Sequence, residues 1–119
     1  MVKVMIVDDD RTTTKLLQTL LELDGFDVTI VGRGGDVLPK MASAQPDVIL
    51  MDYHLSDMEG VDIIRELRQQ PTYAHLPIIM TSGMDVEREA MQAGATTFLL
   101  KPFEPDELPP LFNRLVQGS

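Results

Sequence analysis

The sequence contains no cysteine and no apolar run of membrane-spanning length. Without cysteine the chain can form no disulfide and perform no thiol chemistry. Without a run of about 20 apolar residues it offers no transmembrane helix, and its first apolar run turns acidic too soon for a signal peptide. These absences predict a soluble, cytoplasmic protein with no membrane partner.

Basic residues are also scarce, because ten lysines and arginines stand against 19 aspartates and glutamates and give a formal net charge of −9. A nucleic-acid partner requires a basic face, so the composition argues against DNA and RNA. A length of 119 residues with 44% hydrophobic residues suits one domain with its own core. We therefore predict a single domain over residues 1–119.

Apolar runs of strand length alternate with segments of helical periodicity along the chain. The predicted strands cover residues 2–7, 28–31, 48–52, 76–81 and 97–100. The predicted helices run from the N-cap Asp10 to Asp24, from Asp36 to residue 44, along the stripe 61–67, over 85–93 before Gly94, and to about residue 117. This alternation predicts an α/β fold with a parallel sheet, helices on both faces and right-handed crossovers.

Two segments carry more specific expectations. The glycine-rich residues 32–35 lack the spacing of a phosphate-binding loop, so we expect a flexible turn there, with Asp36 capping the helix that follows. Pro109 and Pro110 cannot lie inside a helix without removing backbone hydrogen bonds. We therefore expect an extended approach over residues 103–107 and a helix from about Pro109 to residue 117.

The central apolar run ends on Asp52, and ligands of open α/β sheets bind beyond the carboxyl ends of such buried strands. Other predicted strands bring polar groups to the same edge: Asp8 and Asp9 after the first, Thr81 after the fourth and Lys101 after the fifth. Carboxylates held together repel one another, and Mg²⁺ relieves that repulsion. A lysine and a hydroxyl suit the oxygens of a phosphoryl group. The pattern predicts phosphoryl transfer with Asp52 as the attacking carboxylate.

Several short motifs follow one another in order along the chain. They are Ile6-Val7-Asp8-Asp9-Asp10, Leu50-Met51-Asp52-Tyr53-His54-Leu55 with Met58-Glu59-Gly60, Met80-Thr81-Ser82-Gly83, Ala93-Gly94-Ala95 and Lys101-Pro102-Phe103. Together they resemble the receiver domain of bacterial two-component response regulators over essentially the whole chain. The resemblance implies a flavodoxin-like, doubly wound five-stranded sheet of order 2-1-3-4-5.

The resemblance also implies roles for individual residues. Asp52 would accept a phosphoryl group from the phosphohistidine of a histidine kinase or phosphotransfer protein, with Lys101 and Thr81 beside that group. Thr81 and Phe98 would form the switch that regulates a downstream protein effector. The peptide bond between Lys101 and Pro102 would be cis. The protein would be a self-modifying switch rather than an enzyme with sustained turnover.

The implied metal is Mg²⁺. Asp9, Asp52 and the backbone carbonyl of His54 would bind it directly, and Asp8 would act mainly through water. Two alternatives stay open. A pseudo-receiver, which binds a partner without phosphorylation, usually lacks the acceptor or an acidic residue, and all are present here. A phosphohydrolase with an aspartyl-phosphate intermediate usually carries a second Asp two residues after the nucleophile, where this chain has His54.

The chain departs from the family pattern in two places that concern its output surface. The segment 81–94 is slightly shorter than usual, and Pro109-Pro110 falls where the last helix is normally uninterrupted. The resemblance implies a partner-binding face formed by the fourth helix, fifth strand and fifth helix. We expect this face to differ from the usual one in this chain and to bind another protein rather than DNA.

Overall fold

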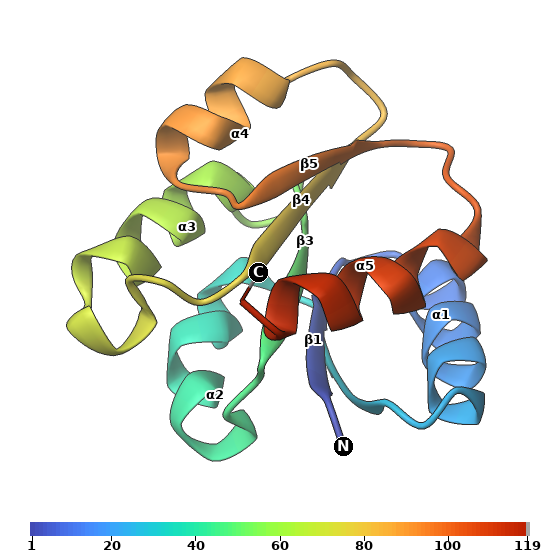
Figure 1. Ribbon diagram of the computed structural model, residues 1–119. Coiled ribbons are helices and arrows are strands. Elements are labelled where there is room, and N and C mark those ends of the chain that lie inside the picture. The colour runs from blue at the N-terminus through green and yellow to red at the C-terminus, as the bar shows by residue number, and fades with distance from the viewer. Residues whose placement is uncertain (119) are drawn as a thin grey trace.

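The computed structural model describes residues 1–118, so that Ser119 of the predicted domain lies outside the described residues. At its centre is a sheet of five parallel strands in the order β2-β1-β3-β4-β5 (Figure 1). The strands are β1 (Lys3–Val7), β2 (Asp27–Val31), β3 (Val48–Asp52), β4 (Ile78–Ser82) and β5 (Thr97–Leu100). The five predicted strands and the implied sheet order are confirmed.

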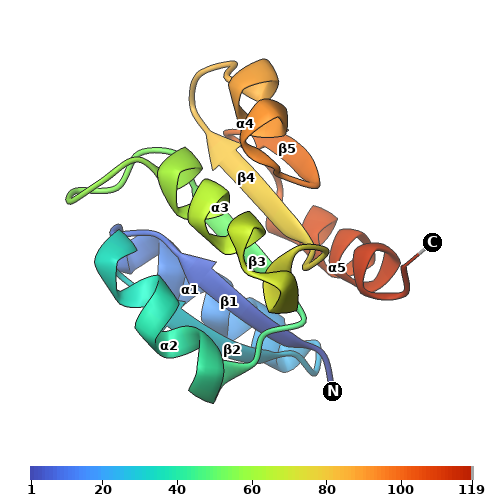
Figure 2. The same ribbon diagram turned by 90° about the vertical axis from the view of Figure 1, so that its left-hand side faces the viewer.

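Helices cover both faces of the sheet. α1 (Arg11–Leu23) and α5 (Leu108–Val116) lie on one face. α2 (Val37–Ala44), α3 (Gly60–Gln69) and α4 (Glu87–Ala93) lie side by side on the other (Figure 2). Within residues 1–118, no helix is both long enough and apolar enough to cross a lipid bilayer.

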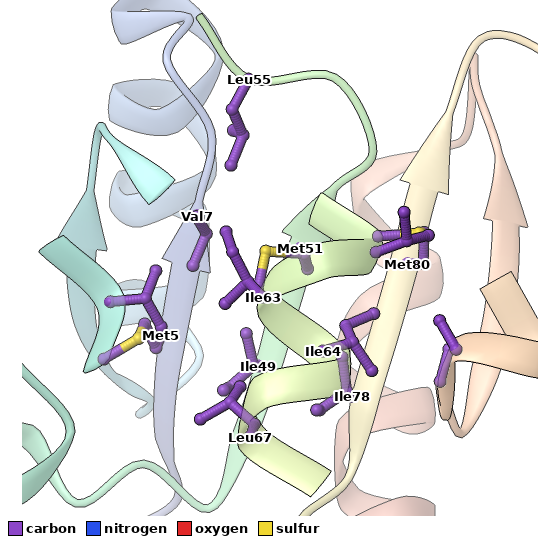
Figure 3. Close-up of a cluster of buried hydrophobic side chains, with 14 of the residues drawn as sticks. Met5, Val7, Ile49, Met51, Leu55, Ile63, Ile64, Leu67, Ile78 and Met80 are labelled. Carbon is purple, nitrogen blue, oxygen red and sulfur yellow. The ribbon is translucent and has the colours of Figure 1, made fainter. Parts of the chain in front are cut away.

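The central strand β3 supplies side chains to both cores. Ile49 and Met51 are buried against the helices of one face, and Val48 and Leu50 are buried against those of the other. Figure 3 shows Ile49 and Met51 among the side chains of neighbouring strands and of α3. Because both faces are covered, the strand must be apolar at every position until the sheet ends. Its first polar residue, Asp52, therefore lies at the carboxyl edge.

Two predicted helix boundaries agree with the structure. The carboxylate of Asp10 accepts hydrogen bonds from the backbone N–H groups of Thr12 and Thr13 and so caps α1. Gly94 ends α4 with a left-handed backbone at φ 114°. The start of α4 was predicted two residues early: the Asp85 side chain accepts a bond from the Glu87 N–H and stays outside the helix.

The turn before α2 differs from the sequence expectation. Asp36 makes no side-chain cap bond, and Gly34–Asp36 form a 3-10 turn, η1, rather than a flexible loop. The carboxylate of Asp57 supplies the cap instead, since Oδ1 accepts from the Gly34 N–H and Oδ2 from the Gly35 N–H, each at 2.9 Å. The prediction of Asp36 as the cap was wrong because the partner lies 22 positions further along the chain.

The approach to α5 also differs from the expected extended chain. Pro105–Glu107 form a 3-10 turn, η3, closed by reciprocal bonds between Glu104 and Glu107. These side chains satisfy N–H groups that would otherwise lack partners, which favours a turn over an extended chain. α5 itself begins at Leu108, one residue before the predicted start, so that Pro109 and Pro110 lie in its first turn.

Candidate functional site

Strand ends gather three carboxylates at the carboxyl edge of the sheet. Asp8 and Asp9 follow β1, and Asp52 is the last residue of β3, which lies next to β1 in the sheet. One carboxylate oxygen from each of the three lies within 4.8 Å of the others. Three negative groups at this separation form an acidic cluster open to a cation, because Asp9 is exposed while Asp8 and Asp52 are largely buried.

Lys101 brings a positive charge to the same cluster. Its Nζ lies 3.1 Å from Asp52 Oδ1 and 3.5 Å from Asp8 Oδ2. The residue follows β5 directly, and its backbone N–H donates to the Ser82 carbonyl at the end of β4. The peptide bond between Lys101 and Pro102 is cis, as the resemblance predicted. The structure therefore places the sequence-predicted lysine between two of the three carboxylates.

Burial disfavours the charged forms of both Asp52 and Lys101. Burial raises the pKa of Asp52, and the negative charges of Asp8 and Asp9 act in the same direction against the hydrogen bond from Lys101. Burial also opposes the charge of Lys101, but the hydrogen bond to Asp52 and the charges of Asp52 and Asp8 outweigh it and raise the pKa of the lysine. Lys101 therefore stays positively charged, but its charge does not fully offset the burial of Asp52 and the negative charges of Asp8 and Asp9.

Thr81 lies beside Asp52 on the neighbouring strand. The two residues are register partners in β3 and β4, and Thr81 is buried at 2% exposure. Its backbone carbonyl accepts a bond from the Tyr53 N–H at 2.8 Å. Phe98 lies one strand further out, in register with Met80, and is half-buried against the α2–α4 core. The predicted switch pair therefore occupies the adjacent strands β4 and β5. Thr81 lies beside Asp52, and Phe98 lies one strand further from it.

The loop between β3 and α3 folds back as a small hairpin. The Gly60 N–H donates to the Tyr53 carbonyl at 2.7 Å, and the Leu55 N–H donates to the Met58 carbonyl at 3.2 Å. Between these bonds, the carbonyl of His54 accepts no hydrogen bond from any group in the described chain. A Cβ at residue 60 would collide with the carbonyl oxygen of Asp52, so only glycine allows this close return of the chain.

A pocket of about 530 Å³ opens beside the cluster. Its lining includes Asp8, Asp52, Thr81 and Lys101 of the cluster. Polar residues at the start of α1 and apolar residues of β1, β3, α1 and the segment after Lys101, among them Leu16, complete it. The imidazole of His54 points elsewhere, is 75% exposed and lies 3.3 Å from Glu59. Acidic, basic and hydroxyl groups therefore meet at one wall of a pocket large enough for a phosphorylated side chain.

Several contacts around the site have no signal in the sequence. The phenol of Tyr53 donates to Glu89 Oε1 on α4 at 2.8 Å, and this bond raises the pKa of Tyr53. The Asp57 carboxylate reaches across to η1. The guanidinium of Arg68 donates to the carbonyls of Gly94 and Tyr73, each at 2.8 Å. Most of these partners lie more than 20 positions apart, and no periodicity or motif connects them.

Residues 4–113 match the family described as the response regulator receiver domain. The chain belongs to that family. It is 34% identical over 117 residues to the regulatory protein AtoC of Escherichia coli K12, covering 97% of this chain and 25% of AtoC. The receiver domain therefore spans about a quarter of that relative.

Solved structures agree with this assignment. A putative response regulator from Chloroflexus aurantiacus is 31% identical, with a TM-score of 0.89 and 97% of each chain covered. The receiver domain of a sensor histidine kinase from Pseudomonas aeruginosa is 28% identical, with a TM-score of 0.87 and 98% of each chain covered. That receiver domain was solved with a magnesium ion coordinated in its active-site cleft. The predicted family and flavodoxin-like fold are confirmed, and with them a role as a receiver domain of two-component signalling.

Proposed function

We propose that this receiver domain takes a phosphoryl group onto Asp52 from the phosphohistidine of a histidine kinase or phosphotransfer protein, in the cytoplasm, and then regulates a protein effector. One observation carries the proposal: Asp8, Asp9 and Asp52 meet within 4.8 Å while Lys101 bonds to Asp52. A carboxylate that only ends a strand would not require two further carboxylates and a lysine beside it.

The residues at the edge of the sheet suit Mg²⁺. Hard divalent cations take oxygen ligands, and Mg²⁺ is commonly held by one or two carboxylates with retained waters. Asp9, Asp52 and the unbonded carbonyl of His54 would hold it directly, and Asp8 would act mainly through water. When bound, Mg²⁺ supplies positive charge to the oxygens of the phosphoryl group. The magnesium in the Pseudomonas receiver domain supports this choice of ion.

The chain's own groups account for the rest of the transfer. A carboxylate oxygen of Asp52 attacks phosphorus as the bond from phosphorus to the imidazole nitrogen breaks, and the bonding electrons return to the imidazole. Lys101 then pairs with a phosphoryl oxygen, and the hydroxyl of Thr81 donates to another. Asp52 is the only acceptor consumed, so the product is a modified switch rather than a released product of turnover.

Two further observations bear on the alternatives. A pseudo-receiver would tolerate loss of the acceptor, the acidic pair or the lysine, yet all four side chains converge here. A phosphohydrolase of the aspartyl-phosphate class would use a second acid two residues after Asp52, whereas the side chain there is a 75% exposed imidazole. Both observations favour the phosphoacceptor switch.

The test is to locate the phosphoryl group. Incubation with Mg²⁺ and acetyl phosphate, followed by trapping and mass spectrometry, is expected to label Asp52 stoichiometrically, and Asp52→Asn is expected to take no label. Asp9→Ala should weaken Mg²⁺ binding and slow labelling, since a direct metal ligand is lost. A label on Asp57 or on a serine, or unchanged Mg²⁺ affinity in Asp9→Ala, would contradict the proposal.

The output surface is the remaining part of the proposal. Apolar side chains of Met84, Met91 and Leu100 are exposed at and around α4 and β5. α4 has only seven residues, and the prolines of α5 occupy its first turn. A formal charge of −9 disfavours DNA on any face of this domain. We therefore assign the α4–β5–α5 face to a protein effector, with Thr81 and Phe98 as the switch behind it.

A further inference from the structure

The loop that carries His54 is anchored at its tip by a side chain, Asp57. The hairpin bonds close the base of this loop, but its tip projects beyond the sheet toward the start of α2 (Figure 2). There the carboxylate of Asp57 accepts from the consecutive N–H groups of Gly34 and Gly35, one per oxygen, at 2.9 Å each. Ionised acceptors form stronger hydrogen bonds than neutral ones, so this pair is the strongest polar contact of the tip.

A close apolar contact accompanies this pair of bonds. A Cβ at Gly34 would lie 2.5 Å from Met58 Cγ and 2.8 Å from Ile63 Cδ1, so Met58 and the turn η1 are in direct contact. The two N–H groups lower the pKa of Asp57 and keep its carboxylate ionised. The tip of the loop is therefore held to η1 by charge and by shape, although Asp57 itself is exposed.

We infer that Asp57 is a positioning residue for the acceptor site: by tying the loop to η1, it holds the backbone carbonyl of His54 where a divalent cation on Asp9 and Asp52 would meet it. Asp57 lies three positions after His54, inside the hairpin that the Gly60–Tyr53 and Leu55–Met58 bonds close. A shift of the tip therefore displaces the base of the same hairpin. The inference rests on the proposed function in one respect, since it takes the carbonyl of His54 as a metal ligand.

The experiment measures Mg²⁺ affinity by calorimetric titration with the metal alone, in the absence of any phosphoryl donor. Outer partners of metal ligands contribute on the order of tenfold or more to affinity, so Asp57→Ala is expected to bind Mg²⁺ about tenfold more weakly. Asp57→Asn keeps one oxygen acceptor and is expected to lose less. Hydrogen exchange at Gly34 and Gly35 should quicken in both variants, most in Asp57→Ala.

Asp36→Asn is the matched control. Asp36 lies in the same turn, is exposed and makes no cap hydrogen bond through its side chain. Its removal changes the net charge near the site as Asp57→Asn does, so it measures the general electrostatic effect on Mg²⁺ binding. Affinity in Asp36→Asn is expected to stay within about twofold of the wild type, because exposed charges at such range are screened by salt.

The measurements distinguish a failure of the positioning role from a failure of the metal site. Equal Mg²⁺ affinity in the wild type and Asp57→Ala, with faster exchange at Gly34 and Gly35, would overturn the positioning role and leave Asp57 as a cap only. Equal losses in Asp57→Asn and Asp36→Asn would overturn it too, because charge alone would explain both. Failure of the wild-type protein to bind Mg²⁺ would overturn the metal site of the proposed function, and this inference with it.

Discussion

The two sides of the sheet edge around Asp52, toward α2 and toward α4, are held by different kinds of contact. On the α2 flank, the Asp57 carboxylate binds two backbone N–H groups, and Met58 presses against Gly34. On the α4 flank, the loop after β3 contacts α4 through a bond between two side chains, from the phenol of Tyr53 to Glu89. Backbone donors are fixed by the turn that carries them, whereas two side chains can part by rotation. The α2 flank is therefore the rigid reference, and the α4 flank is the one able to rearrange.

The burial of the outer strand supports the same contrast. β4 is buried along its whole length, but β5 next to it is only half-buried and ends on the exposed Leu100. Exposed apolar side chains at Met84 and Met91 lie on this side as well. Regions with fewer buried contacts open at lower free energy than the core. The α4 side of the edge is therefore expected to rearrange at a lower free-energy cost than the α2 side.

Gly34→Ala should break the rigid flank most strongly. The added Cβ would lie 2.5 Å from Met58 Cγ, and overpacking of this kind lowers the free energy of unfolding by about 1–3 kcal/mol. Gly35→Ala is the control, because its Cβ would meet only Asp57 Oδ2 at 3.4 Å. Urea unfolding of both variants provides the measurement. Similar stability in the two would show that Met58 yields freely and that this flank is not rigid.

Arg68→Ala should loosen the α4 flank at its base. The guanidinium bonds to the carbonyls of Gly94 and Tyr73 join the ends of α3 and α4, and their loss is expected to lower the free energy of unfolding by about 1–2 kcal/mol. Arg65→Ala should change it by less than about 0.5 kcal/mol, since the ion pair that Arg65 forms with Asp62 is exposed. Thermal unfolding of the two variants compares them directly.

Tyr53→Phe should have a smaller effect on stability and a visible one on α4. Removing the phenol deletes its bond to Glu89, and a half-buried hydrogen bond contributes about 0.5–1 kcal/mol. Amide exchange in α4 is expected to quicken while exchange at Gly34 and Gly35 stays the same. Faster exchange on both flanks would contradict the separation between them.

The smallest expected effect is a pH dependence from Asp57. The N–H groups of Gly35 and Gly34 lower the pKa of this carboxyl in the folded protein. Its contribution to stability is therefore complete above the ordinary aspartate pKa of about 3.9 and is lost as the pH falls through the lowered folded pKa. The stability difference between wild type and Asp57→Asn, followed by denaturant unfolding, should shrink below about pH 4. A difference that grows in acid would contradict the cap.

The sequence predicts the strands and the cluster correctly because each depends on the type of residue at one position along a strand. The apolar run ending on Asp52 predicts a strand buried on both faces, and the structure has it. The polar residues at the other strand ends are predicted to converge, and Asp8, Asp9, Thr81 and Lys101 lie around Asp52. Strand ends of a parallel sheet share an edge, so topology alone gathers these side chains.

Sequence reasoning fails where a partner lies far along the chain. Asp36 stands at the right position to cap α2 but makes no side-chain cap bond, whereas Asp57 caps the preceding turn η1 from another loop. Residues 103–107 were expected to be extended, but the reciprocal bonds of Glu104 and Glu107 close a turn. In the first case the competing carboxylate is brought in by the fold. In the second, a local capping pair outweighs the constraint from the prolines that follow.

The most direct test of the central contrast is amide exchange of the Mg²⁺-loaded protein with and without beryllofluoride, a mimic of the phosphoryl group on Asp52. The account predicts altered protection around Thr81, in α4, at Phe98 and in α5, with unchanged protection at Gly34 and Gly35. Changes confined to the surroundings of Asp52, or changes that reach η1 and α2 but spare Phe98 and α5, would contradict it.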